Sequence, residues 1–149
     1  MTDLQAGLGL SQLRRYPELV NRRHEIIVAY EQGLADLPIE IMAHTGKDFR
    51  SSGHLMLTRL SGKSIDFRNK LIELMAEQGV ATNVHYKPLP LLTAYKNMGF
   101  DIANFPNAYA QYENEITLPL HTLLSNEDVA YVIDVLHACY AQLESEGIN

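Results

Sequence analysis

The sequence predicts an α+β domain in which helices pack on a small antiparallel or mixed sheet. Long segments with apolar residues at helical spacing alternate with shorter segments of β-forming residues bounded by turn residues. The chain has 149 residues, of which 46% are hydrophobic, so a single domain with a buried core is expected. Leading helices are expected over residues 1–35, and the sheet with its other helices over residues 36–149.

Two helices are expected in the N-terminal part of the chain. Thr2 and Gln5 have the spacing of a capping box, so the first helix begins close to residue 1. Proline is favoured in the first turn of a helix, so Pro17 marks the start of a second helix. Gly33 and Pro38 then end this second helix.

The middle of the chain is expected to contain strands. Residues 39–42 and 54–60 are rich in β-forming residues, and the polar segment 44–53 between them suits a hairpin loop. Residues 80–86 form a third candidate strand, which Pro88 stops. A helix is expected to begin at Ser64 or Asp66 and to end before Gly79. A short helix over residues 92–95, a helix from Pro106 and a strand over residues 116–120 are expected after it. The final helix is expected to begin with a capping box of Ser125 and Asp128.

The composition disfavours several classes of protein. A net charge of -6 argues against nucleic-acid binding, which needs a basic face. No segment approaches the roughly 18 apolar residues of a membrane span, so no membrane contact is expected. The single cysteine, Cys139, cannot form an internal disulfide, which favours a reducing, cytoplasmic location. The six histidines include no i, i+4 pair and have no cysteine partner, so no metal site is expected.

The segment TNVHYKPLP, residues 82–90, is the candidate functional segment. Neighbouring side chains on a strand point to opposite faces, so one ring of His85 and Tyr86 is expected in the core and the other in a cleft. Lys87 follows, and Pro88 fixes the direction in which the chain leaves the strand. From the residues alone, a structural histidine at a strand end and a functional histidine both stay open.

Four segments occur in an order that resembles one known family. They are MTDLQAGLGLSQL, SSGHLMLTRL, GVATNVHYKPL and ITLPLHTLLSNEDVAYVIDVL. Together they resemble the C-terminal part of the DegT/DnrJ/StrS family of sugar aminotransferases, which use pyridoxal phosphate (PLP) to aminate keto-sugars attached to a nucleotide. The resemblance implies the small C-terminal domain of a type I aminotransferase. It also implies a homodimeric parent enzyme that takes a nucleotide-sugar substrate in polysaccharide or cell-surface sugar biosynthesis.

The cofactor-binding part of that family has no counterpart in this sequence. Family members bind PLP through a Schiff-base lysine in a Ser/His-rich motif, and an aspartate pairs with the pyridine nitrogen. No lysine here lies in such a motif; the five are Lys47, Lys63, Lys70, Lys87 and Lys96. Because a PLP enzyme needs both groups, we expect no catalytic residue, no bound PLP and no transamination in this chain alone.

The resemblance carries a substrate-binding role onto His85, Tyr86 and Lys87. The family's His-Tyr segment lies near the active-site cleft, so His85 is expected to donate a hydrogen bond to a sugar or phosphate oxygen. Tyr86 is expected to stack on or bond to the hexose, and Lys87 is a candidate phosphate contact. His54 matches another family position, which is either structural or in the cleft. Many members have a second histidine where this chain has Pro90, which puts any contact of that histidine in doubt.

Three hypotheses for function follow. The first is part of a sugar aminotransferase, folded but catalytically incomplete; the second is a stand-alone, non-enzymatic α+β binding or regulatory module. The third, which is less favoured, is a small enzyme that uses His85. A domain separated from a larger fold exposes the surface that packed on the rest, so the first hypothesis predicts that Leu4, Leu8 and Leu13 are exposed or covered by self-association. The second predicts a polar outer face there.

Overall fold

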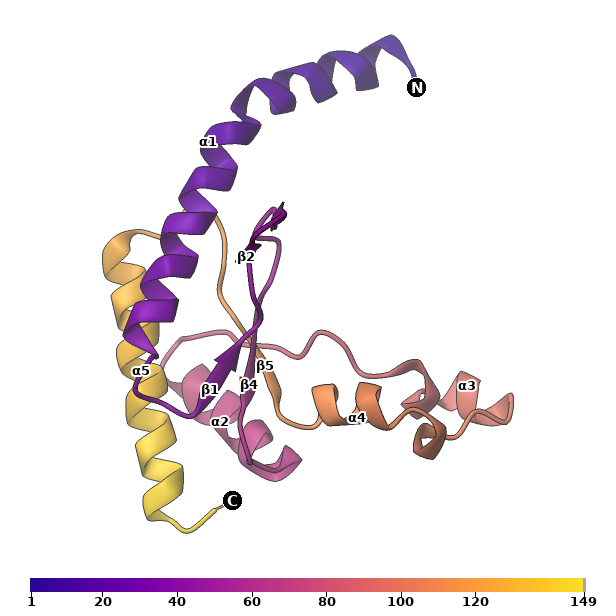
Figure 1. Cartoon of the computed structure of the whole chain (residues 1–149), viewed down its shortest axis with the longest axis vertical. Helices are drawn as coiled ribbons and strands as arrows, with labels where there is room; N and C mark the ends of the chain where they lie inside the picture. The colour runs from indigo at the N-terminus through magenta and orange to yellow at the C-terminus, as the bar shows by residue number, and fades with distance from the viewer. Residues whose placement is uncertain (149) are drawn as a thin grey trace.

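The computed structural model describes residues 1–148 and confirms the α+β class (Figure 1). Three strands form an antiparallel sheet in the order β1-β4-β5, and two short strands form a separate hairpin. The strands are β1 (Ile39–Ile41), β2 (Thr45–Gly46), β3 (Phe49–Arg50), β4 (Met56–Leu60) and β5 (Glu115–Leu118). The helices are α1 (Asp3–Gly33), α2 (Ile65–Glu77), α3 (Thr93–Asn97), α4 (Pro106–Tyr112) and α5 (Asn126–Ser145), with short 3₁₀ turns η1 (Leu89–Leu91) and η2 (Ile102–Asn104).

β4 is the central strand of the sheet, and its sequence explains this position. Along Met56–Leu60 buried side chains alternate with half-buried ones, which is the pattern of a strand with one face on the core. β4 pairs with β1 through Ile39 opposite Leu60, and with β5 through Met56 opposite Leu118. The strands predicted in this region are confirmed, and the polar segment between β1 and β4 includes the β2–β3 hairpin.

Helices α1, α2 and α5 build the core beside the sheet (Figure 1). Phe67 of α2 and Tyr140 of α5 are buried and contact edge to face, with ring centroids 5.1 Å apart. α1 approaches α5 closely at Gly33, where a Cβ atom would lie 2.6 Å from Cδ1 of Ile133. Any larger residue at Gly33 would therefore force Ile133 to move. The ring Nε2 of His137 also donates a hydrogen bond to the Gly33 carbonyl oxygen over 2.8 Å.

The capping residues begin the helices as predicted. Thr2 and Ser125 each form a capping box at the start of α1 and α5. Of the two residues considered for α2, Ser64 is the N-cap, and its side chain accepts a hydrogen bond from the backbone of Phe67. Gly79 follows the C-cap of α2 with a φ of 75°, a left-handed conformation that glycine adopts without strain.

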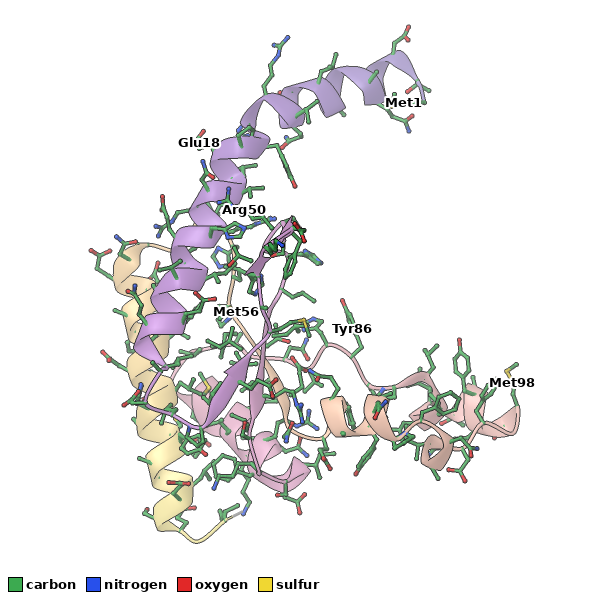
Figure 2. The ribbon with its side chains drawn as sticks, in the orientation of Figure 1. Met1, Glu18, Arg50, Met56, Tyr86 and Met98 are labelled. Atoms are coloured by element: carbon green, nitrogen blue, oxygen red, sulfur yellow. The ribbon has the colours of Figure 1, made fainter. Side chains whose placement is uncertain are left out.

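The N-terminal residues form one helix, which corrects the prediction of two. α1 runs from Asp3 to Gly33 with Pro17 inside it. A proline removes one N–H donor, and its ring crowds the carbonyl group four residues earlier, so a proline inside a helix bends it. Figure 1 shows the bend, and Glu18, labelled in Figure 2, lies beside it. The predicted helix start at Pro17 is wrong because the capped first helix continues through it.

Residues 80–86 do not form the predicted third strand. Asn83 makes an isolated antiparallel bridge to Thr117, with backbone N–H···O distances of 2.8 and 3.3 Å. The next two N–H groups bond to side chains: Val84 donates to Oδ1 of Asn83, and His85 donates to Oε2 of Glu115, each over 2.8 Å. Because side chains satisfy these donors, the backbone ladder stops after one bridge.

Residues 86–112 extend away from the sheet as an arm that carries α3 and α4 (Figure 1). Met98, labelled in Figure 2 towards the end of the arm, is 71% exposed. Arg59 of β4 holds the inner end of the arm by donating to the carbonyl oxygen of Ala110 over 3.2 Å. The arm therefore begins immediately after His85 and returns to the sheet at β5.

Replacing Pro17 with alanine tests the account of the bend in α1. Alanine restores a backbone donor and removes the ring, so we expect a straighter helix whose first half opens less often. Proline costs up to about 3 kcal/mol relative to alanine inside a helix, which sets the upper limit of the gain. Amide hydrogen exchange of residues 8–16 measures the gain in stability of this half of the helix. Tyr16→Ala is a control that leaves the backbone unchanged. Equal exchange in Pro17→Ala and in the native chain would contradict this account.

Candidate functional site

An open hollow of about 300 Å³ lies where three segments of the chain meet. His54 comes from the segment before β4, residues 81–85 run beside β5, and residues 117–120 end β5 and follow it. The segments meet because β4 pairs with β5 and because residue 83 bridges β5. The hollow is lined by His54, Leu55, Ala81, Thr82, Asn83, His85, Thr117, Leu118, Pro119 and Leu120. The structure thus brings two of the predicted site residues, both histidines, to one place.

A chain of hydrogen bonds holds His85 on β5. Its ring Nδ1 lies 2.9 Å from Oγ1 of Thr117. The hydroxyl of Thr117 in turn donates to Oε1 of Glu115 over 2.5 Å, and the backbone N–H of His85 donates to Oε2 of Glu115 over 2.8 Å. One buried carboxyl group therefore fixes both the backbone and, through Thr117, the ring of His85.

Glu115 is an unusual residue for a strand because its carboxyl group is buried. Burial raises the pKa of this carboxyl group above its ordinary value of 4.5. The hydrogen bonds from Thr117 and from the backbone of His85, and the positive charge of Arg68, act in the opposite direction. Arg68 is itself buried; it donates to the carbonyl oxygens of Tyr112 and Glu115, each over 3.2 Å, and its guanidinium lies 5.0 Å from the Tyr112 ring centroid.

Tyr86 and Lys87 do not line the hollow. Tyr86 is 71% exposed, and Figure 2 shows its side chain projecting from the start of the arm. Its ring contacts the His85 ring edge to face, with centroids 4.6 Å apart. The prediction that the two rings occupy opposite faces is therefore wrong, because the segment is not a regular strand at this point. Lys87 is exposed, and the substrate-binding roles of both residues stay predictions.

His54 is exposed, and within residues 1–148 the structure gives its ring no hydrogen bond. His54 lines the hollow, so its place fits the cleft role better than that of a buried structural anchor. Pro90, which stands where many family members have histidine, is buried in η1. It lies outside the lining of the hollow.

Sequence reasoning missed Glu115 and Thr117, which complete the site. The available signal was the alternation in residues 115–118, where two polar residues at positions i and i+2 precede an apolar segment. Side chains two apart on a strand share a face, so these two polar groups had to be near one another. Both are buried, and buried polar groups need partners, which His85 supplies.

The lining of the hollow does not fit PLP on its own. Its titratable side chains are those of His54 and His85, so it offers no lysine for a covalent bond and no arginine for the phosphate group. Lys63, one of the five lysines, lies 2.9 Å from Oε1 of Glu144 and 4.7 Å from the Phe67 ring centroid, beside the core helices. Within residues 1–148 no group of three or more His, Cys, Asp or Glu side chains is placed to hold a metal ion.

Two further sequence expectations concern the whole chain. Cys139 is buried, and burial raises the pKa of its thiol. Over the described part of the chain, none of the helices has the length and apolar character that crossing a bilayer requires. The cytoplasmic location stays a prediction.

The chain belongs to the DegT/DnrJ/EryC1/StrS aminotransferase family, which residues 1–137 match. It is 34% identical over 139 residues to the spore coat polysaccharide biosynthesis protein SpsC of Bacillus subtilis (strain 168), covering 91% of this chain and 36% of SpsC. It is 30% identical over 149 residues to the UDP-4-amino-4,6-dideoxy-N-acetyl-beta-L-altrosamine transaminase of Helicobacter pylori, covering 100% of this chain and 39% of that protein. The chain therefore spans less than two fifths of the length of these relatives.

Solved structures agree with the sequence matches. Spr1654 from Streptococcus pneumoniae, in its PMP form, superimposes with a TM-score of 0.94 at 51% identity, covering 99% of this chain and 37% of that one. Helicobacter pylori PseC, an aminotransferase involved in the biosynthesis of pseudoaminic acid, gives a TM-score of 0.85 at 29% identity, covering 95% of this chain and 38% of PseC. These findings confirm the predicted family and the predicted fold, an α+β chain that matches a part of solved aminotransferases.

Replacing Glu115 with glutamine tests the burial of its carboxyl group through the pH dependence of stability. Because the folded pKa is raised, the folded state holds the proton more tightly than the unfolded chain does. The stability contributed by protonated Glu115 is fully present below the unfolded pKa and is lost as pH rises through the folded pKa. We therefore expect the native chain to lose stability relative to Glu115→Gln as pH rises above the ordinary pKa of a glutamate carboxyl group, measured by urea unfolding.

The comparison with Glu115→Gln cancels the titration of the other groups in the chain. A control pair, Glu113→Gln against the native chain, covers a half-buried neighbour of the same charge. If the stability difference between the native chain and Glu115→Gln does not change with pH, burial does not raise the pKa of the Glu115 carboxyl group.

Proposed function

We propose that this chain is the C-terminal part of a PLP-dependent aminotransferase that aminates a nucleotide-linked keto-sugar for polysaccharide or cell-surface sugar biosynthesis. The observation that carries the proposal is the match of nearly the whole chain to little more than a third of each relative. The name of SpsC supports the pathway class in the proposal, and the name of the altrosamine transaminase supports the substrate class. The parent enzyme is a homodimer in this proposal.

PLP is the cofactor of the parent enzyme in this proposal, and it is held by residues outside this chain. Spr1654 has been solved in both PLP and PMP forms, which supports the cofactor assignment. When bound, PLP supplies the electron sink of transamination. The residues of this chain contribute a wall for the sugar, and the chain alone does not transaminate because no lysine lines the hollow.

The wall centres on His85 and His54, which face the same hollow. We assign His85 to a polar contact with the sugar, because one hydrogen bond holds its ring and another holds its backbone, so the ring is positioned before substrate arrives. Tyr86 is exposed beside the His85 ring and supplies a stacking face for the hexose. Lys87, at the start of the arm, supplies a cation for a phosphate group of the nucleotide.

The exposed side chains of α1 favour this proposal over a stand-alone binding module. Leu4, Leu8 and Leu13 are 76%, 63% and 65% exposed, and Figure 1 shows the first half of α1 extending beyond the sheet. A module that works alone would present polar side chains there, since exposed apolar patches drive association. The apolar face instead fits a surface that packs on the rest of the parent enzyme.

Borohydride trapping tests the catalytic incompleteness of the chain. After incubation with PLP and reduction, we expect low labelling spread over several lysines, because none of them lines the hollow. Mass spectrometry locates the adducts, and Spr1654, which binds PLP, serves as the positive control. Stoichiometric labelling of one lysine, such as Lys87, would show a cofactor site within this chain and would overturn the proposal. Lys87→Arg then identifies that lysine.

The first half of α1 also predicts self-association of the chain in the absence of the rest of the enzyme. We expect the apparent mass to rise with protein concentration, and a dye that binds apolar surfaces to fluoresce, because this face is exposed. Leu8→Glu should reduce both signals, whereas Leu8→Met, which keeps an apolar side chain at the same position, should leave them nearly unchanged. Light scattering over a range of concentrations measures the mass. A compact monomer without dye fluorescence would count against a domain separated from a larger fold.

A further inference from the structure

We infer that Glu115 and Thr117 fix the tautomer of His85, so that Nε2 of its neutral ring accepts a hydrogen bond from a hydroxyl group in the hollow. The inference deepens the proposed function, on which the identity of the ligand rests, because it assigns a hydrogen-bonding role to each atom of the sugar contact. Glu115 and Thr117 are positioning residues here, since they act on the ligand through His85.

The single hydroxyl proton of Thr117 determines the direction of the hydrogen bonds around it. A threonine hydroxyl has one proton to donate and lone pairs to accept. In the structure it donates this proton to Oε1 of Glu115 over 2.5 Å. A carboxylate only accepts, and Oε2 of Glu115 is already occupied by the backbone N–H of His85 over 2.8 Å. The direction of the Thr117 hydrogen bond is therefore set by the charge of Glu115.

The same count of donors and acceptors determines which nitrogen of the His85 ring carries the proton. Oγ1 of Thr117 lies 2.9 Å from Nδ1 of His85, and its only proton is used by Glu115. At this contact Thr117 must accept, so Nδ1 of His85 must carry the ring proton. A neutral imidazole has one N–H, which leaves Nε2 with a lone pair and no proton.

Backbone pairing keeps Thr117 and His85 next to one another. Thr117 pairs with Leu57 in the sheet and bridges Asn83 on its other side. His85 is two residues after Asn83, so both ends of the Thr117–His85 hydrogen bond lie on chain segments that the same bridge joins. Because Glu115 also binds the backbone of His85, the three side chains form one closed network.

The tautomer decides which ligand atom His85 recognises. An Nε2 lone pair accepts from a hydroxyl or amino group and repels a keto or phosphate oxygen, which has no proton to give. A sugar offers several hydroxyl groups, and the lining around His85 includes apolar side chains such as Leu118 and Leu120, against which an unpaired acceptor would be costly to bury. The accepting role inferred for Nε2 reverses the expectation that His85 donates to a sugar or phosphate oxygen.

Glutamine in place of Glu115 should invert the tautomer. The backbone N–H of His85 needs an oxygen opposite it, so the amide group would place its NH₂ against Thr117. Oγ1 of Thr117 would then accept from this NH₂, and its own proton would be free to donate to Nδ1 of His85. The ring proton would move to Nε2. Glu115→Gln changes one oxygen to nitrogen and leaves the shape of the side chain intact.

Nuclear magnetic resonance of the ring nitrogens of this chain tests the inference directly. Two-bond ¹H–¹⁵N correlation separates a protonated ring nitrogen from an unprotonated one, and the spectra are recorded at about pH 8, above the ordinary pKa values of histidine and carboxyl side chains. The His85 signals are assigned by their loss in His85→Gln. We expect protonated Nδ1 in the native chain and in Thr117→Ser, which keeps the hydroxyl, and protonated Nε2 in Glu115→Gln.

Thr117→Val, which removes the hydroxyl, is the second variant and keeps the test decisive if Glu115→Gln does not fold. It should release the ring into a mixture that includes the Nε2–H form. Protonated Nε2 in the native chain, or a tautomer unchanged by both Glu115→Gln and Thr117→Val, would overturn the inference. The measurement uses no substrate and no cofactor, so such a result would leave the proposed function standing. Failure of the borohydride experiment would likewise leave the tautomer assignment intact.

Discussion

The burial of two polar side chains on β5 is the constraint on which the candidate site depends. All four residues of β5 are buried, and Glu115 and Thr117 lie on one face of it. A buried carboxyl group and a buried hydroxyl group are costly without hydrogen-bond partners. The chain supplies them by laying residues 83–85 along the strand. The same contacts that satisfy β5 therefore place the His85 ring at the edge of the hollow, so stability and positioning have one origin.

α1 shows the opposite situation, in which part of an element lacks partners within the chain. Its second half is buried at Ile27 and Tyr30, and the Tyr30 hydroxyl donates to the carbonyl oxygen of Pro119, which lines the hollow. Its first half has apolar side chains on several faces and none of them is buried. A helix that is apolar on several sides is normally covered, and a helical segment of about 14 residues is marginal in water by itself. The capping box and the continuity through Pro17 hold this half in place.

Local signals in the sequence predicted the parts of the fold that local physics decides. Capping residues located the starts of α1, α2 and α5, and the glycine after α2 located its end, because these groups act on the nearest turn. Pro17 misled because a proline in the first turn of a helix and a proline that bends a longer helix give the same local pattern. Residues 80–86 misled because the donors of Val84 and His85 are satisfied by side chains, one of them 30 positions away in the sequence. The role of Glu115 was missed for the same reason, since its partner is distant along the chain.

The charges around the hollow indicate which parts of the proposed enzyme would contact the phosphates and which would contact the sugar. A nucleotide-sugar carries phosphate charges, yet the chain has a net charge of -6 and the lining of the hollow contains neither lysine nor arginine. In the proposed enzyme, cations for the phosphates would therefore come from outside the hollow, from Lys87 on the arm and from the rest of the parent enzyme. What the hollow offers is a histidine of fixed orientation among apolar and uncharged polar groups. In the proposed enzyme, such a surface would discriminate between hydroxyl positions by hydrogen-bond direction, and its effect would be on the orientation of the sugar relative to the cofactor rather than on the strength of phosphate binding.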